Sequence, residues 1–141
     1  MAAIDNNCAY CVEGDKLSPF GIKITDLEHS RLYLFKEQSH KGRVILATKA
    51  HVKDITLLSD AERNGYFADM AKVSNAIQKA FTPDKVNYGA YGDTAGHVHF
   101  HLVPKYKDEF EWTSVFAMNP EKVFLSDDAY AAIIDAIVAH L

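Results

Sequence analysis

The fold of this chain is decided by the stretch Gly96-His97-Val98-His99-Phe100-His101-Leu102-Val103-Pro104, in which three histidines alternate with apolar residues. Successive side chains of a β-strand point to opposite faces, so a strand here places the three imidazoles on one face and the apolar residues on the other. Two interpretations follow. The histidines form either a reaction centre or metal site built on a rigid strand, or the solvated polar face of an edge strand.

The composition is ordinary for a globular protein and narrows the classes of function. The chain has 141 residues, 48% of them hydrophobic and 24% charged, which predicts a single domain over residues 1–141. With a net charge of −4 and a pI of about 5.9, the chain lacks the excess of positive charge that general nucleic-acid binding requires. No apolar run reaches the roughly 18 residues of a membrane-spanning helix, and the N-terminus lacks a secretory signal. We therefore expect a cytoplasmic protein without nucleic-acid or membrane partners.

Outward from the histidine stretch, the pattern predicts an α+β domain of about five antiparallel strands with one long helix on the sheet and a C-terminal helix. The strands are expected at 21–34 as a pair, at 43–48, at 86–91 and from His97 to about Lys105. A capping box at Ser59-Asp60-Ala61-Glu62 opens the long helix, which Thr82-Pro83 ends. The last helix, 129–140, follows the cap Ser126-Asp127-Asp128. The apolar stripes of the two helices predict core contacts at Phe67, Met70, Val73, Ile77 and Phe81, and at Tyr130, Ile133, Ile134, Ile137 and Val138.

The two cysteines, Cys8 and Cys11, have the spacing C-x-x-C. In a reducing cytosol this spacing favours metal or redox use over a structural disulfide. A zinc site needs two further ligands, and His51 and His97 could converge on the pair. The spacing of these histidines alone leaves two free thiols as the alternative. A thioredoxin-like role is disfavoured because no strand precedes the pair.

The histidines themselves suit chemistry at phosphorus. A neutral imidazole is nucleophilic near pH 7 and forms a hydrolysable phosphoramidate, while a protonated neighbour can hold phosphoryl oxygens and protonate a leaving group. The glycine-rich turn from Gly92 to Gly96 precedes the strand and offers backbone N–H groups to a phosphate. A metal-oxidation site is the rival, but no partner set of carboxylates is evident.

The stretch His97-Val98-His99-Phe100-His101-Leu102-Val103 matches the His-φ-His-φ-His-φ-φ motif of the histidine triad (HIT) family, in which φ is an apolar residue. His51 also stands where that family has a histidine. The likeness covers roughly residues 8–112. Segments that resemble one subgroup are Lys36-Glu37-Gln38 with Gly42-Arg43, Asn87-Tyr88, Gly92-Asp93-Thr94 and Pro104-Lys105-Tyr106-Lys107-Asp108.

This resemblance implies a HIT-like fold, a homodimer whose two sheets join, and a cleft for a small-molecule nucleotide. It implies that His99 attacks the α-phosphate of a nucleotide conjugate and becomes a nucleotidyl-histidine, and that His101 contacts and polarises the phosphate. The conjugate would be a dinucleoside polyphosphate or a nucleoside phosphoramidate. A low-turnover nucleotide-binding protein, or transfer of the nucleotide to a sugar phosphate, stays open as an alternative.

The resemblance also implies a cofactor and a set of substrate contacts. Zinc-bearing relatives imply that Zn²⁺ is held by Cys8, Cys11, His51 and His97. Glu37 is expected to reach the ribose hydroxyls, and Asn87 and Thr94 to contact the phosphate or its neighbours.

Three positions depart from the family pattern. Asp93 stands where relatives tend to have Asn or Gln, and a carboxylate there repels phosphate. Lys36 and Lys105 replace arginines and lose bidentate geometry. The histidines at 29, 40 and 140 match no motif and are expected at the surface.

Overall fold

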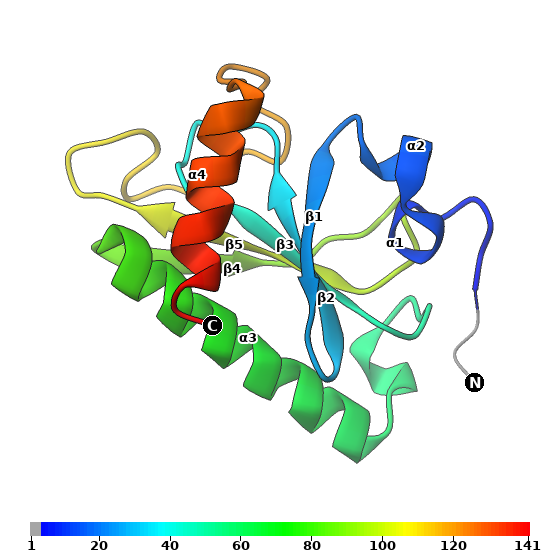
Figure 1. The fold of residues 1–141 in the computed structure, drawn as a ribbon. Coiled ribbons are helices and arrows are strands. Elements are labelled where there is room, and N and C mark those ends of the chain that lie inside the picture. The colour runs from blue at the N-terminus through cyan, green and yellow to red at the C-terminus, as the bar shows by residue number, and fades with distance from the viewer. Residues whose placement is uncertain (1–3) are drawn as a thin grey trace.

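The computed structural model describes residues 4–141, in which five strands form one antiparallel sheet (Figure 1). The strands pair in the order β1-β2-β3-β5-β4, with bounds β1 Gly21–Asp26, β2 Ser30–Phe35, β3 Val44–Thr48, β4 Lys85–Gly89 and β5 His99–Lys105. The helical elements are α1 Ala9–Val12, α2 Gly14–Leu17, the 3₁₀ turn η1 Ile55–Leu57, α3 Asp60–Phe81 and α4 Asp127–Val138. The predicted α+β architecture is confirmed.

The histidine strand β5 lies inside the sheet, between β3 and β4. Leu102 is paired with Val44 of β3 on one side and with Tyr88 of β4 on the other. Because both backbone edges of β5 are hydrogen-bonded, its side chains are held on a rigid element. The interpretation of the histidines as the polar face of an edge strand is therefore wrong.

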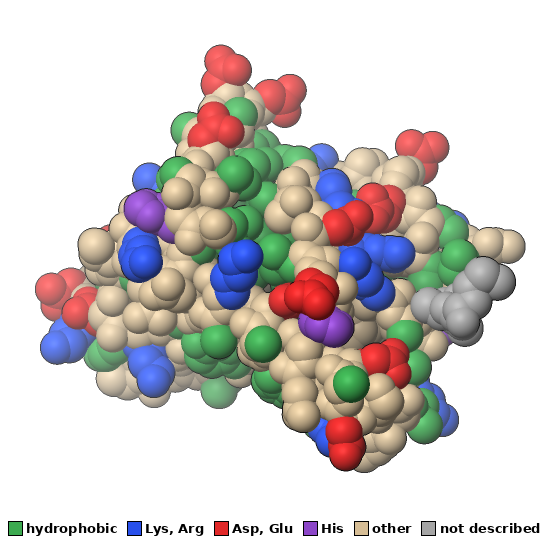
Figure 2. Space-filling view, turned by 60° about the horizontal axis from the view of Figure 1, so that its bottom comes forward, with side chains coloured by type: hydrophobic (Ala, Val, Ile, Leu, Met, Phe, Trp, Pro, Cys, Tyr) green, Lys and Arg blue, Asp and Glu red, His purple; other side chains and the backbone are tan. Residues whose placement is uncertain are grey.

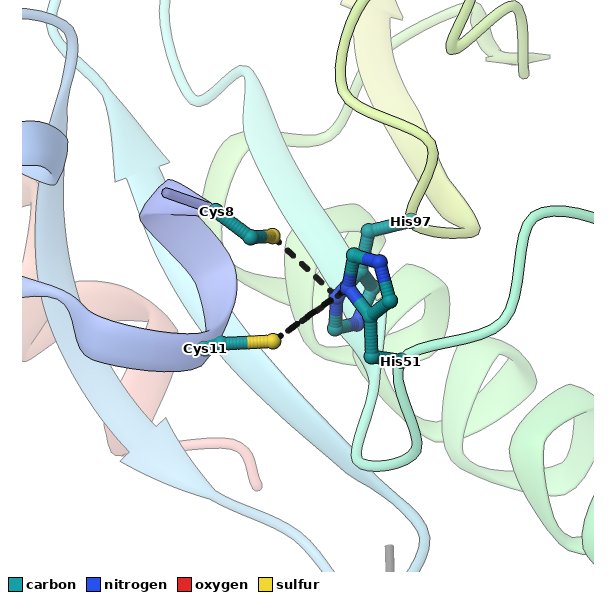
Figure 3. A group of neighbouring side chains, drawn as sticks. All are labelled: Cys8, Cys11, His51 and His97. Atoms are coloured by element: carbon teal, nitrogen blue, oxygen red, sulfur yellow. Dashed lines mark hydrogen bonds between the residues drawn. The ribbon is translucent and has the colours of Figure 1, made fainter. Parts of the chain in front are cut away.

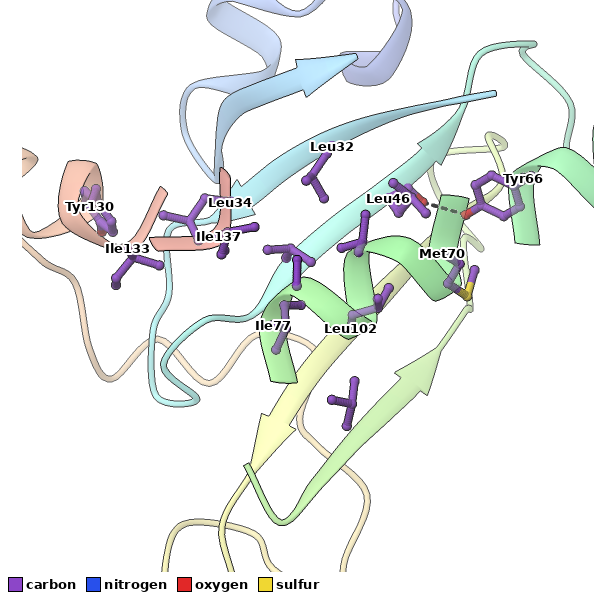
Figure 4. Close-up of a cluster of buried hydrophobic side chains, with 14 of the residues drawn as sticks. Leu32, Leu34, Leu46, Tyr66, Met70, Ile77, Leu102, Tyr130, Ile133 and Ile137 are labelled. Carbon is purple, nitrogen blue, oxygen red and sulfur yellow. Dashed lines mark hydrogen bonds between the residues drawn. The ribbon is translucent and has the colours of Figure 1, made fainter. Parts of the chain in front are cut away.

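The apolar alternates of the histidine stretch lie on the sheet face that α3 covers, as the period-2 pattern predicts; Figure 4 shows Leu102 on this face. Val98 and Leu102 belong to the main core, and Phe100 packs against it. The hydroxyl of Tyr66 on α3 donates to the carbonyl of Leu46 on β3 at 2.6 Å. Burying side chains of this size stabilises the fold by about 1.5–3 kcal/mol each, so this core fixes which face the histidines occupy. Its other members include Leu32, Leu34, Met70, Val73, Ile77, Tyr130, Ile133 and Ile137.

Both predicted helix caps are present. Ser59 and Glu62 form the capping box of α3, and Thr82 ends that helix in a left-handed conformation with φ of 47°. The Ser126 side chain accepts from the backbone N–H of Ala129 at the start of α4, which begins two residues earlier than expected.

The predicted apolar stripes need two corrections. Phe67 is 39% exposed, because its neighbour Tyr66 points into the core in its place. Val138 is 47% exposed at the C-terminal end of α4, so it is not a core residue either. In both helices the error is one position at the margin of the stripe.

A second apolar cluster covers the opposite face of the sheet, the face that carries the histidines. The segment 8–17 contributes to it through Cys8, Tyr10 and Leu17, and the sheet contributes Tyr33, Phe35, Ile45 and Ala47. Where the sequence indicated only turns, the chain forms the single-turn helices α1 and α2. These bring the cysteine pair against the sheet.

Figure 2 turns the lower side of Figure 1, where α3 lies, toward the viewer. On this face cationic and anionic side chains are interspersed. Among the residues that the structure describes, no helix combines the length and apolar character needed to span a bilayer.

Candidate functional site

The three histidines have three different environments. His97 precedes β5 instead of beginning it, so the strand is two residues shorter at this end than predicted. Its side chain turns to the cysteine pair, whereas His99 and His101 line a cavity. All three are buried, with 1%, 7% and 3% of their surface exposed.

The structure brings Cys8, Cys11, His51 and His97 together into one cluster (Figure 3). Their ligand atoms all lie within 4.8 Å of one another. Nδ1 of His97 lies 3.4 Å from Sγ of Cys8, 3.6 Å from Sγ of Cys11 and 3.1 Å from Nδ1 of His51. Sγ of Cys11 lies 3.3 Å from Nδ1 of His51. A metal tetrahedron with bonds of about 2.0–2.3 Å has edges of about 3.3–3.8 Å, so these four residues lie close enough to bind a metal ion.

The hydrogen bonds around the cluster suit a metal as well. Nε2 of His97 lies 2.7 Å from the carbonyl of Thr48, which can only accept, so the proton is on Nε2 and the Nδ1 lone pair faces the cluster. Burial also lowers the pKa of His97 to about 4, which keeps the ring neutral as a ligand must be. On the other imidazole, Nε2 of His51 lies 3.8 Å from the carboxylate of Asp5. A hydrogen bond to a backbone carbonyl, as His97 has, is a usual outer support of a zinc ligand, whereas the separation between His51 and Asp5 is longer than a hydrogen bond.

His99 is held so that one ring nitrogen keeps a free lone pair. Its Nδ1 lies 2.8 Å from the carbonyl of His97, so Nδ1 carries the proton and Nε2 keeps its lone pair. Burial lowers the pKa of His99 below its ordinary value, so the ring stays neutral near pH 7. The phenol ring of Tyr10 packs on it with centroids 4.7 Å apart. The ring is thus held in one tautomer and against one wall.

His101 is arranged in the opposite sense. Its Nδ1 lies 3.2 Å from Nε and 3.0 Å from Nη2 of Arg43, and a guanidinium only donates hydrogen bonds. Nδ1 of His101 is therefore the acceptor, and its proton is on Nε2. The rings of His99 and His101 lie with centroids 5.7 Å apart. The pair offers one free lone pair and one N–H donor at neighbouring positions.

These two histidines line an open cavity of about 610 Å³, which is large enough for a nucleotide. Its walls come from α1 through Tyr10, from the sheet through Phe35 and Ile45, and from the turn that holds Gly92 to Ala95. Met118 and Asn119 close another side. Two carboxylates, Asp5 and Asp93, are among the lining residues of the described chain, and no lysine or arginine is.

The predicted substrate contacts are not all at this cavity. Thr94 lines it. Glu37 lies at a smaller neighbouring cavity of about 100 Å³, which shares Phe20, Phe35 and Asn119 with the main one. Asn87 lines a separate cavity beside β4. The roles proposed for Glu37, Asn87 and Thr94 stay predictions.

The carboxylate of Glu37 is also occupied within the fold. It accepts from Ser39 and from the backbone N–H groups of Lys122 and Val123. Burial alone would raise the pKa of Glu37, but these donors lower it below its ordinary value. A buried, ionised carboxylate here fastens the segment 106–126, which we call the strap, to the sheet.

The expectation that His40 lies at the surface is wrong. It is 5% exposed, and its Nε2 lies 2.8 Å from the carboxylate of Glu111 in the strap. No motif marks this pair because its members are 71 positions apart. His29 is only partly exposed, because it packs over Gly65 of α3, where a β-carbon would come within 2.3 Å of its ring. His140 is exposed as expected.

Sequence patterns also missed Tyr10, Arg43 and the strap. Tyr10 stands between the two cysteines in the sequence, so the turn of α1 that brings the cysteines to the sheet also brings Tyr10 there. Arg43 stands between Gly42 and the apolar strand β3, and a charged residue directly before a buried strand is a signal that could have been used. The strap carries no motif, and only the folded chain shows that Met118 and Asn119 reach the cavity.

Comparison with known proteins identifies the family. The sequence model of the HIT domain matches residues 21–108, which is more than half of the chain. The chain therefore belongs to the histidine triad family.

Three curated relatives are similar to it. Protein hit of Bacillus subtilis is 30% identical over 107 residues, covering 71% of this chain and 72% of the relative. An adenosine 5'-monophosphoramidase of Schizosaccharomyces pombe, hnt1, is 26% identical, covering 83% of this chain and 90% of the relative. An asymmetrical bis(5'-nucleosyl)-tetraphosphatase of the same yeast is 28% identical, covering 57% of this chain and 47% of the relative.

The fold has solved counterparts. A histidine triad protein of Sinorhizobium meliloti superposes with a TM-score of 0.83 at 19% identity, covering 91% of this chain and 95% of that one. At this identity the likeness concerns the fold alone.

Proposed function

We propose that this protein is a hydrolase that cleaves nucleotide conjugates at the α-phosphate through a nucleotidyl-histidine on His99. The observation that carries the proposal is the hydrogen bond from Nδ1 of His99 to the carbonyl of His97, which leaves the Nε2 lone pair free in the cavity. Beside it, the N–H of His101 can donate to a phosphoryl oxygen. Two relatives whose names describe a nucleotide hydrolase support the same class of reaction.

The reaction proceeds in two displacements. Nε2 of His99 forms a bond to the α-phosphorus, and the bond from phosphorus to the leaving group breaks with its electron pair going to the leaving group; an amine leaving group also takes up a proton from solvent water. Water then attacks the same phosphorus and releases a proton to solvent, the N–P bond breaks with its electron pair returning to Nε2, and a nucleoside monophosphate leaves with neutral His99 restored. His101 holds the developing negative charge on the phosphoryl oxygen in both steps.

The charge of the cavity favours a nucleoside phosphoramidate as the substrate over a dinucleoside polyphosphate. A polyphosphate leaving group would carry several negative charges past Asp5 and Asp93, with no lysine or arginine among the described lining residues to balance them. An amine leaving group is neutral or cationic and meets no such repulsion. The carboxylate of Asp93 thus takes part in selecting the leaving group.

The proposed function is tested by trapping the intermediate. The purified protein is mixed with a nucleoside phosphoramidate of a primary amine or with a dinucleoside tetraphosphate and quenched within milliseconds to seconds. We expect a mass increase of one nucleoside monophosphate on the peptide that contains His99, together with nucleoside monophosphate in solution. A parallel reaction with an added sugar phosphate detects transfer. If neither substrate is turned over and no adduct forms, the protein is a nucleotide-binding protein and the proposal is wrong.

The choice of leaving group is tested by Asp93→Asn. Removing one exposed carboxylate from the cavity should raise kcat/KM for the dinucleoside tetraphosphate by about three- to fivefold and lower it for a cationic phosphoramidate by a similar factor. The effect should shrink as salt is raised toward 1 M, because the charges are screened. Asp108→Asn, which removes an exposed carboxylate that does not line the cavity, serves as the control. If the ratio of the kcat/KM values for the two substrates is the same in Asp93→Asn as in the native protein, Asp93 does not select the leaving group.

We also propose that the cluster of Cys8, Cys11, His51 and His97 holds Zn²⁺. Two thiolates and two neutral imidazoles at tetrahedral spacing are a donor set that zinc prefers. With all four positions filled by protein, the bound ion would act as a cross-link between α1 and the residue that precedes β5. The role is structural, and no step of the reaction passes through the metal.

A further inference from the structure

Arg43 is the most deeply enclosed charge near the site. It is fully buried, and its guanidinium lies between two aromatic rings, with Cζ 4.3 Å from the centroid of Phe35 and 4.9 Å from that of Phe116. Stacking of this kind holds the guanidinium in one plane. Burial lowers the pKa of Arg43 to about 10, which still leaves it charged at neutral pH.

Every donor nitrogen of this guanidinium has a partner. Nε and Nη2 point at Nδ1 of His101, Nη1 donates to the carbonyl of Ala117 at 2.9 Å, and Nη2 donates to that of Met118 at 3.1 Å. The same group therefore contacts His101 on one side and the strap on the other. Since Met118 lines the cavity, the wall and the histidine are fixed by one side chain.

The contact with His101 decides what that histidine can do. With Nδ1 accepting from a cation, the only proton of the ring is on Nε2, facing the substrate. Burial and the charge of Arg43 lower the pKa of His101 to about 2, so a second proton is not taken up. His101 can thus donate a hydrogen bond to the phosphate but cannot act as the acid that protonates a leaving group, a role that sequence patterns left open for a neighbouring histidine.

We propose that Arg43 is the positioning residue of this site, and that it locks His101 in the Nε2–H tautomer while it fixes Met118 of the strap at the cavity wall. The proposal rests on the proposed function for its catalytic meaning, but not for its geometry. Its consequence is that the proton needed by the leaving group comes from water or from the leaving group itself. A phosphoramidate whose nitrogen is already protonated releases a neutral amine without further help, and one whose nitrogen is not protonated takes the proton from water.

The test uses ¹⁵N-histidine NMR on the full chain, with the His101 signals assigned by their loss in His101→Gln. We expect a protonated Nε2 and an unprotonated Nδ1 for His101 in the native protein, unchanged from pH 5 to pH 8. In Arg43→Met, which has no donor, both tautomers should appear. In Arg43→Lys a single ammonium can replace only some of the hydrogen bonds that the guanidinium makes, so the Nε2–H tautomer of His101 should be partly retained. Arg63→Lys on the exposed side of α3 is the matched control.

Kinetics provide the second readout. We expect kcat for the phosphoramidate to fall about 10–100-fold in Arg43→Met and less in Arg43→Lys, with KM changed by no more than about threefold, because the loss is in stabilising the transition state. A native His101 protonated on Nδ1 overturns the proposal even if the variants do not fold. So does an Arg43→Lys or Arg43→Met protein with a native tautomer and native kcat. Failure of the proposed function is distinguishable, since it removes turnover and adduct from the native protein and leaves the NMR result intact.

Discussion

Replacing His99 with asparagine is expected to lower kcat for hydrolysis of a nucleoside phosphoramidate by at least about 10⁴-fold. The asparagine amide can still donate to the carbonyl of His97, where Nδ1 of His99 does so at 2.8 Å, so the local fold should survive. The variant has no lone pair that can form a bond to phosphorus. Without the covalent step, only direct attack by water remains, assisted by His101 and by the shape of the cavity.

This prediction is checked by steady-state rates together with nucleotide affinity. Binding of the product nucleoside monophosphate, measured by calorimetry, should stay within about tenfold, since most contacts with the nucleotide are made elsewhere in the cavity. His140→Asn is a suitable control because His140 is exposed and far along the chain from the site. If His99→Asn retains more than a few per cent of native kcat, or if the adduct still forms, another residue is the nucleophile.

The second large effect concerns the metal cluster. Replacing Cys11 with serine should reduce bound zinc from about one per chain to well below one, because a hydroxyl is a poor fourth ligand beside a thiolate and two imidazoles. The variant should be less stable by at least about 3 kcal/mol at micromolar free zinc, which corresponds to a melting temperature lower by roughly 10 °C. Elemental analysis measures the metal, and calorimetry measures the melting temperature.

Val12→Ala tests whether the loss is due to the ligand, since Val12 lies in the same helical turn, is 39% exposed and binds nothing. A chelator should lower the melting temperature of the native protein and of Val12→Ala alike, and should have little effect on Cys11→Ser. Full zinc content in Cys11→Ser or in Cys8→Ser would show that the ligand set is wrong. An equal response of all variants to the chelator would show that the metal does not stabilise the fold.

The architecture was predictable because the sequence repeats its apolar residues with clear periods. Alternation over His97 to Val103 predicted the face of β5 that enters the core, the capping box predicted where α3 begins, and the cap at Ser126 predicted the start of α4 to within two residues. Errors arose where tertiary packing decides. A helix stripe cannot distinguish Tyr66 from Phe67 at its margin, and no local pattern indicated that residues 9–17 would form two helical turns against the sheet.

The residues of the candidate site were predictable where a sequence motif identifies them. Features that are set by contacts between distant segments of the chain were not. The grouping of Cys8 and Cys11 with His51 and His97 followed from the family resemblance, and the structure brings those residues together. The division of tautomers between His99 and His101 did not follow, because it is set by a carbonyl and by Arg43. The position of the strap could not be predicted, because its contacts join His40 to Glu111 and Glu37 to Lys122, residues that are more than 70 positions apart. The homodimer and the cytoplasmic location stay predictions.

The metal cluster also has a consequence for the order of events during biosynthesis. Cys8 and His97 are 89 positions apart, so on a ribosome that adds about 5–20 residues per second the thiols emerge roughly 5–20 s before their last partner. During that interval α1 can pack only against β2 and β3, because His97 and β5 are not yet made. The cluster therefore cannot close before His97 has emerged, and until then the nascent chain carries two thiols without their histidine partner.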